Sequence, residues 1–86
     1  MKDSSSTQYF NFQKEPEQVI RDIIDDVYLA LKEKGYNPVS QIVGYVMSGD
    51  PTYITSYKNA RAQIMQVERD EILEVLLKDY IEVHFQ

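Results

Sequence analysis

The hydroxyl groups near the amino terminus are the residues of this sequence best suited to covalent modification. Four of them are consecutive, from Ser4 to Thr7, within the polar stretch MKDSSSTQ. Because short polar side chains have nothing to bury, we expect residues 1–14 to form a flexible N-terminal tail or arm. A phosphoryl group on one of these hydroxyls would add nearly two negative charges and three strong acceptor oxygens. Composition alone leaves two interpretations open, a solubilising tail and a phosphoacceptor segment.

The other groups with possible chemistry lack visible partners. A possible carboxylate cluster is formed by Asp22, Asp25 and Asp26. Because adjacent side chains on a helix point about 100° apart, a solvated acidic face is the favoured interpretation of these aspartates. His84 is the single histidine, and the absence of cysteine excludes disulfides, thiol catalysis and cysteine-ligated zinc. The glycines lack the strand and lysine of a phosphate-binding loop. We therefore expect no catalytic residue, no metal ligand and no cofactor.

Length and charge narrow the class of protein. Eighty-six residues, 43% apolar and 27% charged, are typical of one soluble globular domain. The net charge of −5 and the scattered basic residues argue against nucleic-acid binding, which needs a basic surface. No apolar run approaches the roughly 20 residues of a membrane span, and the N-terminus lacks the apolar region of a signal peptide. We expect a cytoplasmic protein without direct membrane insertion.

Turn signals divide the chain into helices. The stretch GYNPVSQIVGYVMSGDP, residues 35–51, twice places a glycine before an Asn-Pro or Asp-Pro pair. Glycine readily ends a helix, and proline is favoured at the first position of the next one. This pattern predicts helices over residues 16–34, 38–48 and 68–83, a helical turn after Asp50, and a bend between residues 55 and 60. The fold class is therefore all-α, with about four helices in one domain over residues 15–86.

The apolar stripes of these helices predict a core and an interface. Ile20, Ile23, Ile24, Val27 and Leu31 cover one side of the first helix. On the last helix the apolar arc is about 140° wide, which exceeds what one neighbouring helix covers. We expect an intertwined or face-packed homodimer, another backbone close to Gly44, and an ion pair between Glu74 and Lys78. The candidate core and dimer residues are Ile42, Val43, Gly44, Val46, Ile72, Leu73, Leu76, Leu77 and Tyr80.

A family resemblance rests on several blocks of the sequence. These are GYNPVSQIVGYVMSGDPTYI from Gly35, Tyr57, Asn59-Ala60-Arg61, Ile64 and ERDEIL from Glu68, together with Phe10-Asn11 and Asp26-Val27-Tyr28. As a combined string they resemble the IreB family, small cytoplasmic regulators of Gram-positive bacteria. The resemblance covers nearly the whole chain.

The resemblance implies a dimeric helical protein without catalytic activity. It further implies phosphorylation of the N-terminal tail by a membrane-anchored serine/threonine kinase of the PASTA type, with a cognate phosphatase and an unknown downstream protein as further partners. The implied role is negative regulation in cell-envelope stress and cephalosporin resistance. Thr7 occupies the position of a phosphothreonine in the family pattern, and Ser4 occupies the second position, where the family has threonine.

Three alternatives remain beside this expectation. A helix-turn-helix module would use residues 38–48 and 51–66 as its helix pair, but the second helix carries only Lys58 and Arg61 as cations. A generic scaffold and a small enzyme are the other two.

Arg61 and Arg69 are possible receivers of a tail phosphate. Arg61 could instead bond helix carbonyls or Asp50, and Arg69 could pair with nearby acids.

Overall fold

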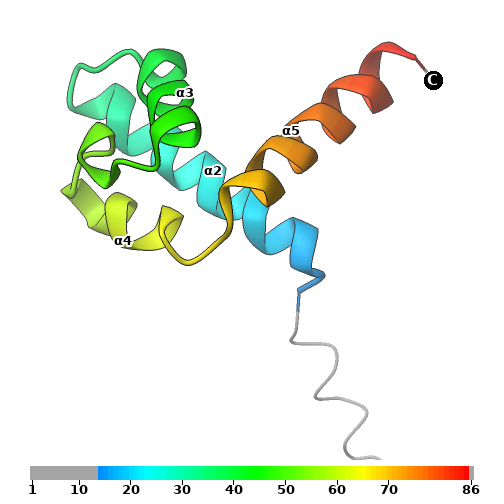
Figure 1. The fold of residues 1–86 in the computed structure, drawn as a ribbon, viewed down its shortest axis with the longest axis horizontal. Coiled ribbons are helices and arrows are strands. Elements are labelled where there is room, and N and C mark those ends of the chain that lie inside the picture. The colour runs from blue at the N-terminus through cyan, green and yellow to red at the C-terminus, as the bar shows by residue number, and fades with distance from the viewer. Residues whose placement is uncertain (1–13, 86) are drawn as a thin grey trace, which may run out of the picture.

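The computed structural model describes residues 14–85, and the regular structure in this range is helical throughout (Figure 1). The elements are α2 (Pro16–Glu33), α3 (Pro38–Ser48), the 3₁₀ turns η1 (Pro51–Tyr53) and η2 (Tyr57–Asn59), the short α4 (Ala60–Ile64), and α5 (Arg69–His84). Helix α2 is central, because α3, α4 and α5 all contact it. The predicted all-α fold with about four helices is confirmed. The N-terminal tail expected over residues 1–14 lies outside this range, except for Lys14.

The predicted turn signals have the expected local structure. At the end of α2, Gly35 has a φ of +85° and the Tyr36 N–H donates to the Leu31 carbonyl over 2.9 Å. The Asn37 side chain then caps α3 by accepting from the Ser40 N–H over 3.1 Å. Helix α3 ends at Gly49, whose φ is +76°. Both boundaries of α3 match the prediction because each depends on neighbouring residues only.

The segment between α3 and α5 is broken into short pieces. Asp50 caps η1 through the Thr52 N–H and hydroxyl, at 3.0 and 2.7 Å. Lys58 and Asn59 have φ values of +53° and +63°, which confirms the bend predicted between residues 55 and 60. The continuous helix over residues 51–66 that a helix-turn-helix module would require is not formed.

The core lies between α2 and the other elements. Ile54 and Ile64 are completely buried, although they belong to the short pieces after α3. Tyr45 and Val75 are also buried, whereas the apolar stripes described above omit both residues. The buried apolar residues are Ile20, Ile23, Val27, Ala30, Leu31, Tyr45, Ile54, Ala60, Ile64, Ile72 and Val75. No helix within residues 14–85 combines the length and the apolar character that a membrane crossing needs.

The close neighbour of Gly44 is an aromatic ring of the same chain. A Cβ atom added to Gly44 would lie only 2.4 Å from the Tyr53 ring. Next to it, the Gln41 side-chain amide donates to the Tyr53 carbonyl over 2.8 Å, so η1 is held against α3. The expectation of another backbone at this glycine is therefore corrected, because the space is filled by a side chain from η1.

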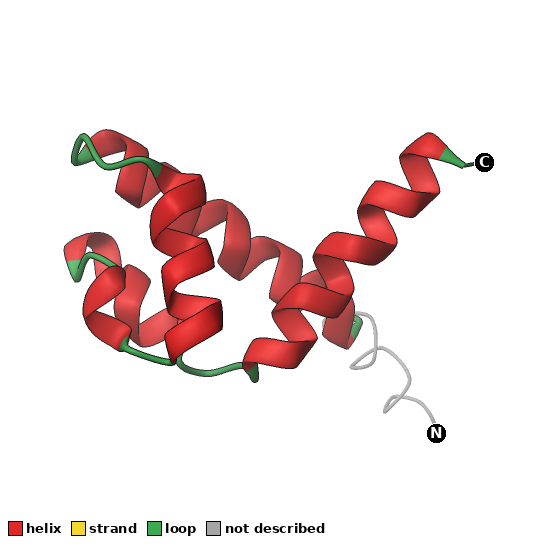
Figure 2. Cartoon of the chain, turned by 45° about the horizontal axis from the view of Figure 1, so that its top comes forward, coloured by secondary structure: helices red, strands yellow, loops and turns green. Residues whose placement is uncertain are grey.

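Helix α5 packs with a different face from the one the periodicity suggests. Ile72 and Val75 point into the core, whereas Leu73, Leu77 and Tyr80 are all more than half exposed. Figures 1 and 2 show the C-terminal half of α5 running away from α3 and α4. The core therefore holds only one edge of the wide apolar arc, and the rest of the arc faces outward.

Candidate functional site

An uncovered apolar surface begins on α3. Val39, Val43 and Met47 recur every four residues, which places them along one side of the helix. Their exposed fractions lie between 54 and 78%. Ile42 and Val46, on the neighbouring side of α3, are half-buried against the core. The outer side of α3 is thus as apolar as its inner side.

The same surface continues onto α5. Met47 and Leu73 border one hollow of about 530 Å³, and its other lining residues are Val46 and the charged residues Glu68, Arg69 and Asp70. One and two turns after Leu73, Leu77 and Tyr80 follow on the same side of α5, each 55% exposed. Contiguous exposed apolar surface of this kind marks a site of protein contact. We call the six residues Val39, Val43, Met47, Leu73, Leu77 and Tyr80 the α3–α5 surface.

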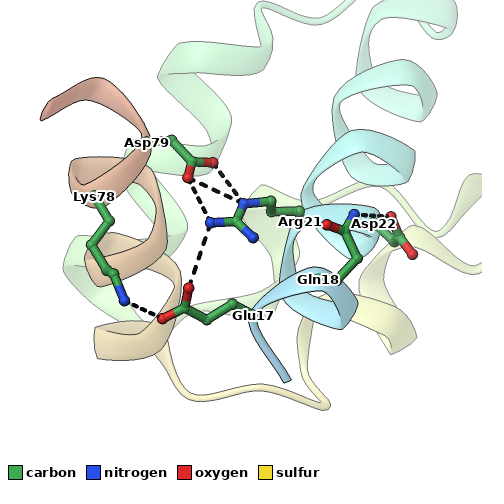
Figure 3. A network of polar contacts seen from close by, with 6 residues as sticks. All are labelled: Glu17, Gln18, Arg21, Asp22, Lys78 and Asp79. Atoms are coloured by element: carbon green, nitrogen blue, oxygen red, sulfur yellow. Dashed lines mark hydrogen bonds and ion pairs between the residues drawn. The ribbon is translucent and has the colours of Figure 1, made fainter. Parts of the chain in front are cut away.

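A network of four charged side chains joins α2 to the middle of α5 (Figure 3). The Arg21 guanidinium donates to both carboxylate oxygens of Asp79, with Nε–Oδ2 and Nη2–Oδ1 distances of 2.9 and 2.7 Å. Glu17 lies between two cations, with an oxygen 3.5 Å from Arg21 Nη2 and a hydrogen bond from Lys78 Nζ. We call Glu17, Arg21, Lys78 and Asp79 the α2–α5 latch. It replaces the expected Glu74–Lys78 pair, because Lys78 reaches across to α2.

The latch favours the charged forms of its members. The hydrogen bond from Lys78 lowers the pKa of Glu17, and the hydrogen bonds from Arg21 lower the pKa of Asp79. The same contacts raise the pKa values of Lys78 and Arg21. All four side chains are partly exposed, so the latch remains accessible to water and to other charged groups.

The chain enters α2 on the side of the helix that carries Gln18 and Asp22. Lys14 Nζ lies 2.5 Å from Asp22 Oδ2, and the Gln18 amide donates to the other oxygen of Asp22 over 3.0 Å. The hydrogen bond from Lys14 lowers the pKa of Asp22. These contacts hold the first described residue against α2 through Asp22.

The two arginines considered as phosphate receivers bind backbone carbonyls. Arg61 Nε donates to the carbonyls of Pro51 and Ile54, at 3.1 and 2.8 Å, which confirms the alternative that Arg61 bonds carbonyl oxygens. Arg69 Nη1 donates to the Val46 carbonyl over 3.0 Å and does not pair with acids as expected. Both side chains therefore stabilise the fold of the segments around them.

The remaining polar groups form no catalytic arrangement in the part of the chain that the structure describes. His84 Nδ1 lies 2.9 Å from the Tyr80 carbonyl oxygen, and the two rings stack with centroids 4.1 Å apart. Asp25 and Asp26 are exposed. Within residues 14–85, no three acidic or histidine side chains come close enough to hold a metal ion.

Comparison with known families identifies the family of the chain. The family model described as "IreB regulatory phosphoprotein" matches residues 5–82. The chain belongs to the IreB family. The family description fits a regulatory role.

Close relatives of this IreB-family chain cover almost its whole length. A UPF0297 protein of Lachnoclostridium phytofermentans is 65% identical over 86 residues, which span all of this chain and 98% of the relative. UPF0297 proteins of Ruminiclostridium cellulolyticum and Acetivibrio thermocellus are each 54% identical, over 93 and 92% of this chain and 91 and 88% of their own lengths. The likeness thus extends over whole chains.

The structure separates the predicted site residues of the IreB-family chain into three groups. The candidate phosphoacceptors Ser4 and Thr7 lie outside the described residues. Ile72 is buried in the core, and three residues of α3 are half-buried, namely Ile42, Gly44 and Val46. The remaining candidates are 40–57% exposed, and they are Val43, Leu73, Leu76, Leu77 and Tyr80.

Sequence reasoning missed the α2–α5 latch. Its cross-helix contacts join residues 58 and 61 positions apart, Arg21 with Asp79 and Glu17 with Lys78. Only the spacing of Glu17 and Arg21, four residues apart on one helix, gave a local signal. That spacing predicts a pair within α2 and contains no information about α5.

Proposed function

We propose that this chain is a non-enzymatic regulatory protein of the cytoplasm, phosphorylated on its N-terminal tail by a PASTA-type serine/threonine kinase. It acts through protein contacts, as a homodimer, and is a negative regulator in cell-envelope stress and cephalosporin resistance. The observation that carries this proposal is membership of a family described as regulatory phosphoproteins. The fold adds an exposed apolar surface suited to a protein partner.

Thr7 is the principal acceptor in this proposal. The family match begins at residue 5, so it includes Thr7 and excludes Ser4. Serine also carries a hydroxyl acceptor, and Ser4 is the second site. In the reaction, the γ-phosphoryl group of ATP is transferred to the threonine hydroxyl oxygen, ADP leaves, and the hydroxyl proton passes to the kinase's base. A cognate phosphatase reverses the change by hydrolysis and releases inorganic phosphate.

A second copy of the chain is the proposed occupant of the α3–α5 surface. An 86-residue chain has a small core, and association is a common way for such chains to gain stability. The exposed residues come from two helices that border one hollow at Met47 and Leu73, so one partner can cover both helices. The aromatic side chain of Tyr80 belongs to a residue type enriched at protein interfaces. A further, downstream protein then binds the dimer.

A non-enzymatic role agrees with the polar groups. Catalysis requires a nucleophile or an acid–base group with a partner that orients it in a pocket. The Nδ1 atom of His84 lies within hydrogen-bond distance of the Tyr80 carbonyl oxygen, one turn earlier in the same helix. The carboxylates of the latch are paired with cations, which suits a structural role.

The phosphorylation proposal is tested by incubating the full chain with the PASTA-type kinase of its organism and ATP. Phosphate is then located by mass spectrometry. We expect incorporation at Thr7, with a lower level at Ser4, and loss of the main product in Thr7→Ala. Thr52→Ala is the matched control, because the Thr52 hydroxyl is bonded to Asp50 within η1. If mass spectrometry found no phosphate on residues 4–7, the proposal would be contradicted.

A further inference from the structure

The tail raises the question of which basic group receives its phosphate. Arg61 and Arg69 are engaged with backbone carbonyls. Lys32 and Lys34 lie at the C-terminal end of α2, over the rings of Tyr28 and Tyr57. The remaining cations among residues 14–85 are Lys14, Arg21, Lys58 and Lys78, each of which has an acidic partner.

Distance along the chain selects among these cations. Thr7 lies seven residues before Lys14, and seven residues span at most about 25 Å. Arg21 is seven residues after Lys14, which corresponds to about 10 Å along a helix. Lys34 is about 30 Å away by the same measure, and Lys58 lies at that end of α2 too, paired with Glu33. Arg21, and Lys78 beside it through Glu17, therefore lie within this reach, whereas Lys34 lies beyond it.

The geometry of the latch contains a position that fits a phosphate. The Glu17 carboxylate lies between Arg21 and Lys78 and contacts both (Figure 3). A phosphate has three acceptor oxygens and nearly two negative charges, so it satisfies two cations better than one carboxylate does. The planar guanidinium of arginine also matches phosphate with paired hydrogen bonds.

We propose that Arg21 and Lys78 form a receiving site for the phosphorylated tail, in which the phosphate on Thr7 takes the place of the Glu17 carboxylate. This inference rests on the proposed phosphorylation of the tail. The tail is attached to α2, so the phosphate meets the site at the high effective concentration of an intramolecular ligand. The competing acids at the site are Glu17 and Asp79, and Asp25 lines the same hollow as Arg21 and Asp79. Glu74 lies one turn before Lys78 on α5, and Glu82 one turn after it.

Occupation of this site changes the junction between α2 and α5. The core residues of α5, Ile72 and Val75, belong to its first two turns, and the latch is the next attachment along the helix. A dianion between Arg21 and Lys78 ties the two helices more strongly than the single charge of Glu17. The outer turns of α5 carry Leu77 and Tyr80 of the α3–α5 surface, so the tail phosphate acts on the surface proposed to bind a partner.

The test uses the full chain made by chemical synthesis with phosphothreonine at position 7, so that it does not depend on any kinase. The second pKa of the phosphate, normally about 6, is followed by ³¹P NMR during a pH titration. Neighbouring cations favour the dianion, so we expect a pKa lower by about half a unit or more than in the isolated phosphopeptide of residues 1–13. Arg21→Gln and Lys78→Gln should each raise it, and Glu17→Gln should lower it further by removing the competing carboxylate.

Lys34→Gln and Lys14→Gln are the matched controls. The first removes a distant cation, and the second removes a nearby cation outside the latch. Equal phosphate pKa values in the wild type, Arg21→Gln and Lys78→Gln, or an increase confined to Lys14→Gln, would overturn the receiving site. Lys78 is more than half exposed, so its replacement keeps the test valid if Arg21→Gln fails to fold.

Hydrogen exchange gives the second readout. Phosphorylation should slow amide exchange of residues 77–84 several-fold, and this protection should disappear in Lys78→Gln. Amide exchange that is unchanged or faster after phosphorylation would contradict the claim that the phosphate strengthens the attachment of α5 to α2. If a kinase fails to modify Thr7 while the synthetic phosphoprotein behaves as described, the proposed function fails and the receiving site stands.

Discussion

The two ends of this small protein are held together in different ways. Around α4, the chain turns back on itself in short pieces, and Ile54, Ala60 and Ile64 are completely buried. The outer half of α5 lies at the other end and is attached through the charged α2–α5 latch. Its apolar residues Leu77, Tyr80 and Val83 are 55–77% exposed. The first end is stabilised by the chain's own core, and the second presents apolar side chains that residues 14–85 leave uncovered.

This difference indicates that one end stabilises the fold and the other is available for contact with a partner. Apolar burial is the main favourable term in folding, so the α4 end supplies the stability of the domain. An exposed apolar helix costs solubility unless a partner covers it. The outer half of α5 is thus the part of the molecule best suited to regulated contact.

Replacement of one buried residue at the α4 end should have the largest effect on stability. Ile64→Ala removes three carbon atoms from a site with no exposure and should lower the free energy of unfolding by about 2–5 kcal/mol. Leu77→Ala on the outer half of α5 should change the stability of a single chain by about 0.5 kcal/mol or less. Urea unfolding at low protein concentration measures both changes, and equal losses would contradict the contrast between the two ends.

A smaller effect is expected at the contact between α3 and η1. Gly44→Ala brings a methyl group within 2.4 Å of the Tyr53 ring, so the ring must move. Since alanine also gains about 1 kcal/mol in helix propensity, the net loss of stability should be about 1 kcal/mol. In a Tyr53→Ala background the clash is absent, and Gly44→Ala should become stabilising. The same loss in both backgrounds would show that Tyr53 is not the limiting contact.

The smallest effect concerns the latch and depends on pH. The folded-state pKa values of Glu17 and Asp79 are lowered by Lys78 and Arg21, so these carboxylates contribute stability above their ordinary values near 4. This contribution is lost as the pH falls from about 5 through the folded-state pKa values. The urea midpoint should therefore decrease less on acidification in a Glu17→Gln, Asp79→Asn double variant than in the wild type.

Glu74→Gln is the control for this experiment, because Glu74 is an exposed acid of α5 outside the latch. It should leave the slope of the acid response close to that of the wild type. If the urea midpoint of the double variant decreased on acidification as much as that of the wild type, the latch would not contribute to the attachment of α5.

Local chemistry explains why the helix boundaries could be predicted. The ends of α2 and α3 depend on Gly35, Asn37 and Gly49, each of which acts on backbone groups a few residues away. The cap of η1 by Asp50 is equally local. Such signals require no knowledge of the rest of the fold.

The contacts between elements could not be predicted in the same way. A wide apolar arc on α5 predicts more than one neighbour, but it does not show which side faces its own core, so Val75 was missed. The neighbour of Gly44 depends on how η1 folds back onto α3. The latch joins α2 to α5 across most of the chain. Each of these features is set by tertiary packing.

The mass of the protein in solution tests the central claim most directly, namely that a second copy covers the α3–α5 surface. Sedimentation equilibrium at micromolar concentration should give twice the chain mass of 10.1 kDa for the wild type. Leu77→Asp should restore the mass of a single chain, and Leu29→Asp, an exposed replacement on α2 away from this surface, should leave the dimer intact. A wild-type mass of 10.1 kDa, or a dimer that Leu77→Asp leaves unchanged, would contradict the account.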